Sequence, residues 1–339
     1  MSSSEVTRQG LRGMRPGREA GPGRPARRRG RRGEQAMVPA AEFTSYYGKP
    51  VINAPVWGSR DIAGYLFLGG LAGGSALLGA GAQATGRPAL ATAAKTAAFG
   101  AGCVSVAALI HDLGRPARFG NMLRVFKVTS PMSMGSWLLG GFVPATGVAA
   151  ASAWTGKVPR LGTAATAVSA LLGPAVATYT AVLVSNTAVP AWHDGHRELP
   201  FVFAGSAAMA AGGLGLLAAP AGQNAPARNL ALLGAGAEAV AFELMTKRMG
   251  MVGEPYSADR AGSYHRASQA LLALGVAGAL LGRRHRVIAA LSGMALLGAS
   301  AATRWAVVHA GLASAADPKY TVVPQRQRRD GDGAAAEAG

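Results

Sequence analysis

Eight long apolar runs follow one another along this 339-residue chain, and they constrain its fold more than any other feature. Each run is close to the roughly 20 residues that a helix needs to cross the hydrocarbon core of a bilayer. We place the runs at residues 62–84, 90–111, 132–153, 161–184, 199–219, 227–247, 266–282 and 286–312. The sequence therefore predicts an all-α integral membrane protein with eight transmembrane helices.

The distribution of charge supports a membrane protein rather than a nucleic-acid-binding one. The chain carries 34 Lys and Arg residues against 16 Asp and Glu residues, which gives a formal net charge of +18. Residues 1–60 hold 12 of the basic residues, and most of the others lie in links between apolar runs rather than on a soluble basic domain. The loops on the two sides carry nearly equal numbers of Lys and Arg, so the basic tails decide the orientation. We expect a multi-pass plasma-membrane protein with both termini in the cytoplasm and no nucleic-acid partner.

The chain divides into three parts by composition. Residues 1–45 are rich in Arg, Gly and Pro and cannot bury enough apolar area to fold, so they are predicted to form a disordered basic tail on anionic lipid. They do not resemble a signal peptide, because no apolar stretch follows the arginines until about residue 62. Residues 46–312 form the predicted membrane domain, and residues 313–339 form a polar C-terminal tail.

Residues that could hold a redox centre are scarce. A single cysteine is too few for an iron–sulfur cluster or a cysteine-based zinc site. A membrane haem would need two histidines at matched depth, and only His111 and His309 are candidates, both at the ends of apolar runs. We therefore expect no haem, no iron–sulfur cluster and no metal site, so any redox role requires a partner protein.

Three charged residues lie inside the apolar runs, where a charge is costly and often functional. Glu238 is nearest the middle of its run, whereas Glu243 and Arg304 lie at similar depth on different runs. A buried Glu243–Arg304 ion pair would offset the desolvation of both groups. The pair could be a static contact, or the three charges could form a proton relay or the wall of a polar cavity.

The first apolar run is dense in glycine. The pairs Gly69/Gly73 and Gly70/Gly74 have the four-residue spacing that lets another transmembrane helix approach closely. A phosphate-binding loop would need a preceding strand, which the sequence does not predict. These glycines are therefore predicted to serve helix packing.

The link between the second and third runs is the most specific part of the sequence. It reads HDLGRPARF at residues 111–119 and SPMSMGSW at residues 130–137. These segments closely resemble the D-L-G-R-P-x-R-F and S-P-M-S-x-G-x-W pattern of the NrfD/polysulfide-reductase family of membrane subunits. The glycine-rich GLAGG at 70–74, YTAVLVS at 179–185 and LPFVF at 199–203 agree with it, so the resemblance covers about residues 45–312.

The resemblance implies an eight-helix, haem-free subunit that exchanges electrons with membrane quinone, menaquinone or ubiquinone, in anaerobic respiration. It has no complete active site alone. Its implied partners are a four-cluster ferredoxin-like iron–sulfur subunit and a molybdopterin catalytic subunit, and the basic N-terminal region resembles versions from formate-dehydrogenase-type complexes.

In the family, quinone is held near the start of the first helix and by a tyrosine on the fourth, which Tyr179 matches. Near the start of the first helix, where relatives often carry Asn and His, this chain has Asp61 and Tyr65. Tyr179 or Tyr65 could donate a hydrogen bond to a quinone carbonyl, and Asp61, His111 or Asp112 could deliver protons.

The same link also predicts a short interfacial amphipathic helix between the second and third transmembrane helices. Its basic residues alternate with apolar ones and would contact lipid headgroups or a partner subunit: Arg115, Arg118, Arg124 and Lys127. Ser130 and Pro131 are expected to end this segment and to start the next helix.

Two other functions fit the same residues. The chain could translocate an ion or solute, which the charges inside the apolar runs favour. It could also be a passive membrane anchor that holds a redox partner without binding quinone.

Overall fold

A computed structural model describes residues 5–7, 10–12, 50–53, 55–113, 117–283 and 285–338. Its internal contacts divide the chain into two units, Met1–Glu42 and Phe43–Gly339, which are described separately. In the first unit, strand β1 (Glu5–Thr7) pairs with strand β2 (Gly10–Arg12) in antiparallel fashion. The remainder of the tail that the sequence predicts to be disordered lies outside the described residues.

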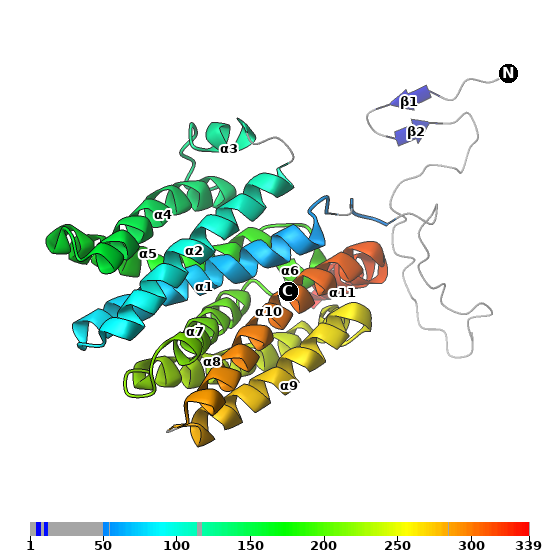
Figure 1. Cartoon of the computed structure of the whole chain (residues 1–339). Coiled ribbons are helices and arrows are strands. Elements are labelled where there is room, and N and C mark those ends of the chain that lie inside the picture. Colours follow the sequence, from blue (N-terminus) through cyan, green and yellow to red (C-terminus); the bar gives the residue numbers. More distant parts are fainter. Residues whose placement is uncertain are drawn as a thin grey trace. The chain divides into compact units, whose positions relative to one another are not determined.

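The second unit is a bundle of helices (Figure 1). In chain order its elements are α1 (Ser59–Ala84), α2 (Pro88–Asp112), α3 (Ala117–Met122), α4 (Pro131–Thr155), α5 (Pro159–Ser185), α6 (Pro190–His193), α7 (Leu199–Ala218), α8 (Ala225–Met249), the 3-10 helix η1 (Gly250–Tyr256), α9 (Asp259–Leu281), α10 (Arg286–Ala316) and α11 (Lys319–Ala338). Each predicted apolar run corresponds to one long helix. The largest difference at a helix start is in α9, which begins at Asp259, seven residues before the predicted start at residue 266. Its first two turns are polar, so an apolar run could not predict them.

Among the described residues, six helices are long and apolar enough to cross a membrane: α1, α2, α4, α5, α7 and α10. Helices α8 and α9 have comparable lengths of 25 and 23 residues but contain more charged and polar side chains. The protein is therefore an all-α, multi-pass membrane protein with six candidate spans of clear apolar character.

Proline and serine fix where several helices begin. Pro88, Pro131 and Pro159 each occupy the first turn of a long helix, where the missing N–H leaves no hydrogen bond unmade. Ser130 caps α4 as predicted, because its hydroxyl accepts a hydrogen bond from the backbone N–H of Ser133 at 3.4 Å. Gly156, with φ of +68°, then ends α4 in the left-handed conformation that suits glycine.

The eight long helices form two halves of four. In the first half (α1, α2, α4 and α5), α1 packs mainly against α2 and α5; in the second half (α7–α10), α7 packs mainly against α8 and α10. The two halves meet through α1, α5, α7 and α10 (Figure 1). One contact differs between them: α2 packs well against α4, whereas α8 and α9 touch only slightly.

Glycine permits the closest helix contacts, as the sequence predicts. A Cβ atom added to Gly73 would lie 2.3 Å from the backbone oxygen of Gly173 on α5, and one added to Gly74 would lie 2.5 Å from the oxygen of Ala207 on α7. Both distances are far below van der Waals contact, so a side chain at either position would force the helices apart.

The predicted amphipathic helix is shorter in the structure. Helix α3 ends at Met122, so Arg124 and Lys127 lie beyond it. Side chains of α4 hold this stretch out of a helix: the Ser133 hydroxyl donates to the oxygen of Val125 at 2.7 Å and accepts from the N–H of Lys127 at 3.0 Å. A helix continued through these residues would need the same backbone groups for its own hydrogen bonds.

The C-terminal region is more helical than its polar composition indicates. Helix α10 extends four residues past the predicted end at 312, and α11 follows after a short break. Lys319 at the start of α11 forms an ion pair with Glu254 of η1, with 3.1 Å between Nζ and Oε2. This pair connects the start of α11 to the link between α8 and α9.

Candidate functional site

Two tyrosines meet where α1 and α5 lie side by side. Tyr65 lies eight residues before Gly73 on α1, and Tyr179 lies six residues after Gly173 on α5, so each is about 9–12 Å from the glycine crossing along its antiparallel helix. Their hydroxyl groups are hydrogen-bonded to each other, and their rings meet edge to face with centroids 6.5 Å apart. The close helix crossing thus brings together the two tyrosines that the sequence predicts.

The position of the Tyr179 ring depends on a glycine in the SPMSMGSW segment. A Cβ atom added to Gly135 of α4 would lie 2.4 Å from Cε2 of Tyr179. The ring therefore packs directly on the α4 backbone, which explains why this segment contains a glycine one turn into the helix.

Tyr179 lines a cavity of about 520 Å³ at this end of the first half. One wall comes from the segment before α4 and its first turns, and the other comes from the end of α5 and the loop that follows. The polar residues that line it with Tyr179 are Thr129, Ser185, Asn186, His193 and His196. Its volume lies within the range of about 300–1,000 Å³ typical of small-molecule sites.

Asp61, His111 and Asp112 form a second polar group at the same end of α1. His111 Nδ1 lies 2.9 Å from Asp61 Oδ2, and Asp112 Oδ1 accepts a hydrogen bond from the N–H of Gly58 at 2.8 Å. Asp61 is one helical turn from Tyr65 on α1, so their side chains share a face. The Asp61–His111 pair, with side chains that are 35% and 79% exposed, therefore lies at the surface, one turn of α1 from Tyr65.

An ion pair fixes the loop that carries His193 and His196. Arg248, at the end of α8, donates two hydrogen bonds of 2.6 Å to the carboxylate of Glu198, and a third of 2.5 Å to the backbone oxygen of Asp194. The hydrogen bonds from Arg248 lower the pKa of Glu198. The second half thus holds in place one wall of a cavity in the first.

One of the predicted basic contact residues, Lys127, lies beside this cavity. Arg118, Arg124 and Lys127 are exposed, and Lys127 adjoins Val128, a lining residue. Arg118 also donates to the backbone oxygen of Leu113 at 3.1 Å. Arg115 lies outside the described residues.

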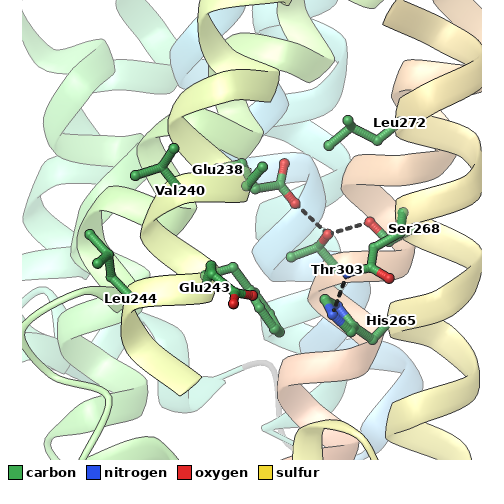
Figure 2. A pocket seen from close by; sticks show the side chains of 11 residues that line it. Glu238, Val240, Glu243, Leu244, His265, Ser268, Leu272 and Thr303 are labelled. Atoms are coloured by element: carbon green, nitrogen blue, oxygen red, sulfur yellow. Dashed lines mark hydrogen bonds between the residues drawn. The ribbon is translucent and has the colours of Figure 1, made fainter. Parts of the chain in front are cut away.

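The structure contradicts the predicted Glu243–Arg304 ion pair. Arg304 is fully buried; its Nη2 donates to the backbone oxygen of Phe203 at 3.0 Å, and its guanidinium stacks 3.6 Å from the centre of the Phe203 ring. The carboxylate close enough to interact with it electrostatically is Glu238, which accepts a hydrogen bond from Thr303 (Figure 2). Glu243 is exposed and pairs instead with Lys247, with 3.0 Å between Oε1 and Nζ.

Comparison with protein families establishes the family to which this chain belongs. The family model described as "Polysulphide reductase, NrfD" matches residues 50–246, more than half of the chain. The chain belongs to the NrfD family. The matched region contains the tyrosine pair, its cavity and all of the first half, so this NrfD-family protein is a membrane subunit of a redox complex. A comparison with curated proteins gave no match.

Sequence reasoning missed several cavity residues of this NrfD-family chain. His193, His196, Ser185 and Asn186 line the cavity but were not predicted as site residues. The available signal was the position of these polar residues directly after the helix that carries Tyr179. Gly135 was part of a recognised motif, but its role appears only when the α4 and α5 backbones are placed together.

Proposed function

We propose that this NrfD-family subunit exchanges electrons between a docked iron–sulfur subunit and membrane quinone, at the cavity beside Tyr179. The observation that carries the proposal is the Tyr65–Tyr179 hydrogen bond at the wall of a 520 Å³ cavity. Reduction of quinone requires two electrons and two protons. The electrons come from the partner, and this chain supplies the binding site and the route for protons.

We assign a role to each predicted residue from its position. The Tyr179 hydroxyl, on the cavity wall, donates a hydrogen bond to a quinone carbonyl, and Tyr65 behind it orients that hydroxyl. The Asp61–His111 pair lies one helical turn further toward the surface and replaces the proton that the tyrosine pair passes on. Asp112 positions this end of α1 through its bond to Gly58.

The setting of the site in the membrane is part of the proposal. All eight long helices cross the plasma membrane, including α8 and α9, and both termini lie in the cytoplasm. Among the charges of α8, Arg228 and Glu238 are buried within the protein, whereas the exposed Glu243, Lys247 and Arg248 lie in the last two turns of the helix, where water is available. This distribution allows α8 to span without exposing a charge to lipid near its middle.

The proposed partners are a four-cluster ferredoxin-like iron–sulfur protein and a molybdopterin subunit, in a complex of the formate-dehydrogenase type. Arg118, Arg124 and Lys127 are exposed, and Lys127 adjoins the cavity residue Val128, on the side where a partner must approach for its electrons to reach quinone. Whether quinone is menaquinone or ubiquinone depends on the membrane that holds the complex.

Substitution of Tyr179 by phenylalanine tests the proposal. In the intact complex, Tyr179→Phe should lower the rate of quinone reduction by about 100-fold, because a positioned proton donor is lost while the ring still packs on Gly135. The matched control is Tyr264→Phe on α9, which is remote from this cavity. An unchanged rate in Tyr179→Phe, with all partner subunits still bound, would leave a passive anchor as the function. Ion flux without partner proteins would instead indicate a translocator.

A further inference from the structure

A second cavity, of about 550 Å³, lies in the other half of the molecule between α8 and α9 (Figure 2). It exists because these two helices touch only slightly. Its outer wall includes Val240 and Leu244, whose exposed fractions are 60% and 57%, and its inner end reaches Thr303 of α10, which is 2% exposed. The cavity therefore connects the surface that faces lipid with the core of the second half.

A buried carboxylate with a free oxygen lies at the inner end. Glu238 is 3% exposed, and its Oε1 accepts from Thr303, which is bonded in turn to Ser268 at 2.7 Å. Its buried Oε2 makes no hydrogen bond in the described part of the chain, and the nearby Ser206 hydroxyl is bonded to Ser300 at 2.8 Å. A buried oxygen without a hydrogen-bond partner is unfavourable, so a group that donated to this carboxylate would be stabilised there. Figure 2 shows the Glu238 carboxyl turned toward Thr303, which is bonded in turn to Ser268.

The charges around the cavity restrict what can bind there. Glu238 and Glu243 both line it, and no Lys or Arg is among its described lining residues, so an anionic head such as phosphate would be repelled. Arg304, on the far side of Glu238, interacts electrostatically with that carboxylate and opposes the binding of a further cation. A neutral head that donates a hydrogen bond is the remaining choice.

The shape of the cavity favours a flat ring with an apolar tail. Phe242 and His265, both lining residues, stack on each other with centroids 4.2 Å apart and planes 11° apart, which gives the cavity an aromatic wall. Val240 and Leu244 at the mouth offer apolar contact for a chain that continues into lipid.

We infer that the cavity between α8 and α9 is a second binding site, which takes a neutral, hydroxyl-bearing ring with an apolar tail, the chemistry of a hydroquinone. A ring hydroxyl donates to the carboxylate of Glu238, the ring lies against Phe242 and His265, and the tail leaves between α8 and α9. The inference rests on the proposed function only in taking hydroquinone as the ring-bearing molecule available in the membrane. It assigns binding to this site and no electron transfer.

Photolabelling of the intact complex tests the inference. The probe is a hydroquinone with a photoreactive diazirine on its side chain, and the labelled peptides are identified by mass spectrometry. We expect label on peptides of α8 and α9, separately from label on peptides of α4 and α5 around Tyr179. Leu272→Trp, which fills the cavity from α9, should reduce the α8–α9 label about tenfold, whereas Leu274→Trp, an exposed leucine of the same helix outside the cavity, should not.

Glu238→Ala provides a second test that adds no bulk. It removes the free oxygen and should reduce the α8–α9 label by about tenfold as well, through the lost hydrogen bond. Label at the Tyr179 cavity in the same sample shows that each variant is folded.

The outcomes separate this inference from the proposed function. Label at the Tyr179 cavity alone would overturn the second site and leave the proposed function intact. Label at α8 and α9 alone, lost in Leu272→Trp, would support the second site and contradict the first. Label at α8 and α9 that survives both Leu272→Trp and Glu238→Ala would show non-specific contact with lipid-facing helices and would overturn the inference.

Discussion

Each half of the protein contains a close crossing of two helices at a pair of glycines, but the buried polar side chains differ between the halves. In the first half α1 meets α5 at Gly73 and Gly173; in the second half α7 meets α10 at Gly213 and Gly293, where an added Cβ on Gly293 would lie 2.3 Å from the oxygen of Gly213. Both contacts are direct approaches of two backbones. The helix frame is therefore repeated, and it does not by itself decide what each half does.

The polar groups near these crossings differ in kind. The first half places two hydroxyls together at the wall of a cavity, Tyr65 and Tyr179. The second half buries a carboxylate and a guanidinium, Glu238 and Arg304, both with unpartnered polar atoms among the described residues. Helix packing adds to the contrast. Helices α2 and α4 pack well against each other, whereas α8 and α9 touch only slightly and leave a cavity open between them.

The largest expected effect comes from placing a side chain in the glycine crossing of either half. Gly73→Leu should destabilise the protein by about 3 kcal/mol or more, because the side chain would overlap the backbone of α5. Gly293→Leu should have a similar effect through the oxygen of Gly213. Thermal unfolding in detergent measures both. Gly81→Leu on α1 is the control, since an added Cβ there meets nothing within 4 Å. If only one of the two crossing variants is destabilised, the halves do not depend on the same contact.

A smaller loss should follow from removal of one buried charge in the second half. Arg304→Met leaves the buried carboxylate of Glu238 without its nearby positive charge, and we expect a loss of about 2 kcal/mol in unfolding free energy. The double variant Glu238→Gln/Arg304→Met should be more stable than the sum of the two single effects predicts. Strictly additive losses would show that the two charges do not interact.

Sequence patterns predicted the positions of the long helices well, but they predicted poorly which face of a helix carries a given side chain. All eight apolar runs became helices, and both Tyr65 and Tyr179 were singled out, although the hydrogen bond between them was not predicted. Depth alone suggested Glu243 as the partner of Arg304. Glu238 and Glu243 are five residues apart and so point about 140° apart around α8, and the structure turns only Glu238 toward the core.

The contacts of irregular segments were also beyond prediction. The early end of α3 depends on two hydrogen bonds of the Ser133 hydroxyl, which donates to the oxygen of Val125 and accepts from the N–H of Lys127 once α4 is in place. The lining of the Tyr179 cavity likewise depends on the loop that Arg248 holds from the second half. Tertiary contacts of this kind leave no periodic signal in the sequence.

The ion pair that holds this loop should give a modest dependence of stability on pH. The pKa of Glu198 is lowered in the folded protein, so its contribution is present above the unfolded pKa of about 4.3 and is lost as pH falls through the folded pKa. We expect Glu198→Gln to cost about 1 kcal/mol at neutral pH and to flatten the acid limb of an unfolding curve. Glu254→Gln is the control, because its pair with Lys319 is more exposed. An acid limb that is the same in Glu198→Gln would contradict the role of this pair.

The smallest expected effect distinguishes the two glutamates of α8. Glu243 and Lys247 have side chains that are 61% and 71% exposed, so water weakens their attraction, and Glu243→Gln should change stability by less than about 0.5 kcal/mol. Glu238→Gln, at a site that is 3% exposed beside Arg304, should have a larger effect of either sign, because the substitution removes a buried charge and changes the hydrogen bond from Thr303. Thermal unfolding of both variants in the same detergent measures the difference. A larger effect in Glu243→Gln would mean that Arg304 faces Glu243 after all, and the contrast between the two halves would then lose its central pair.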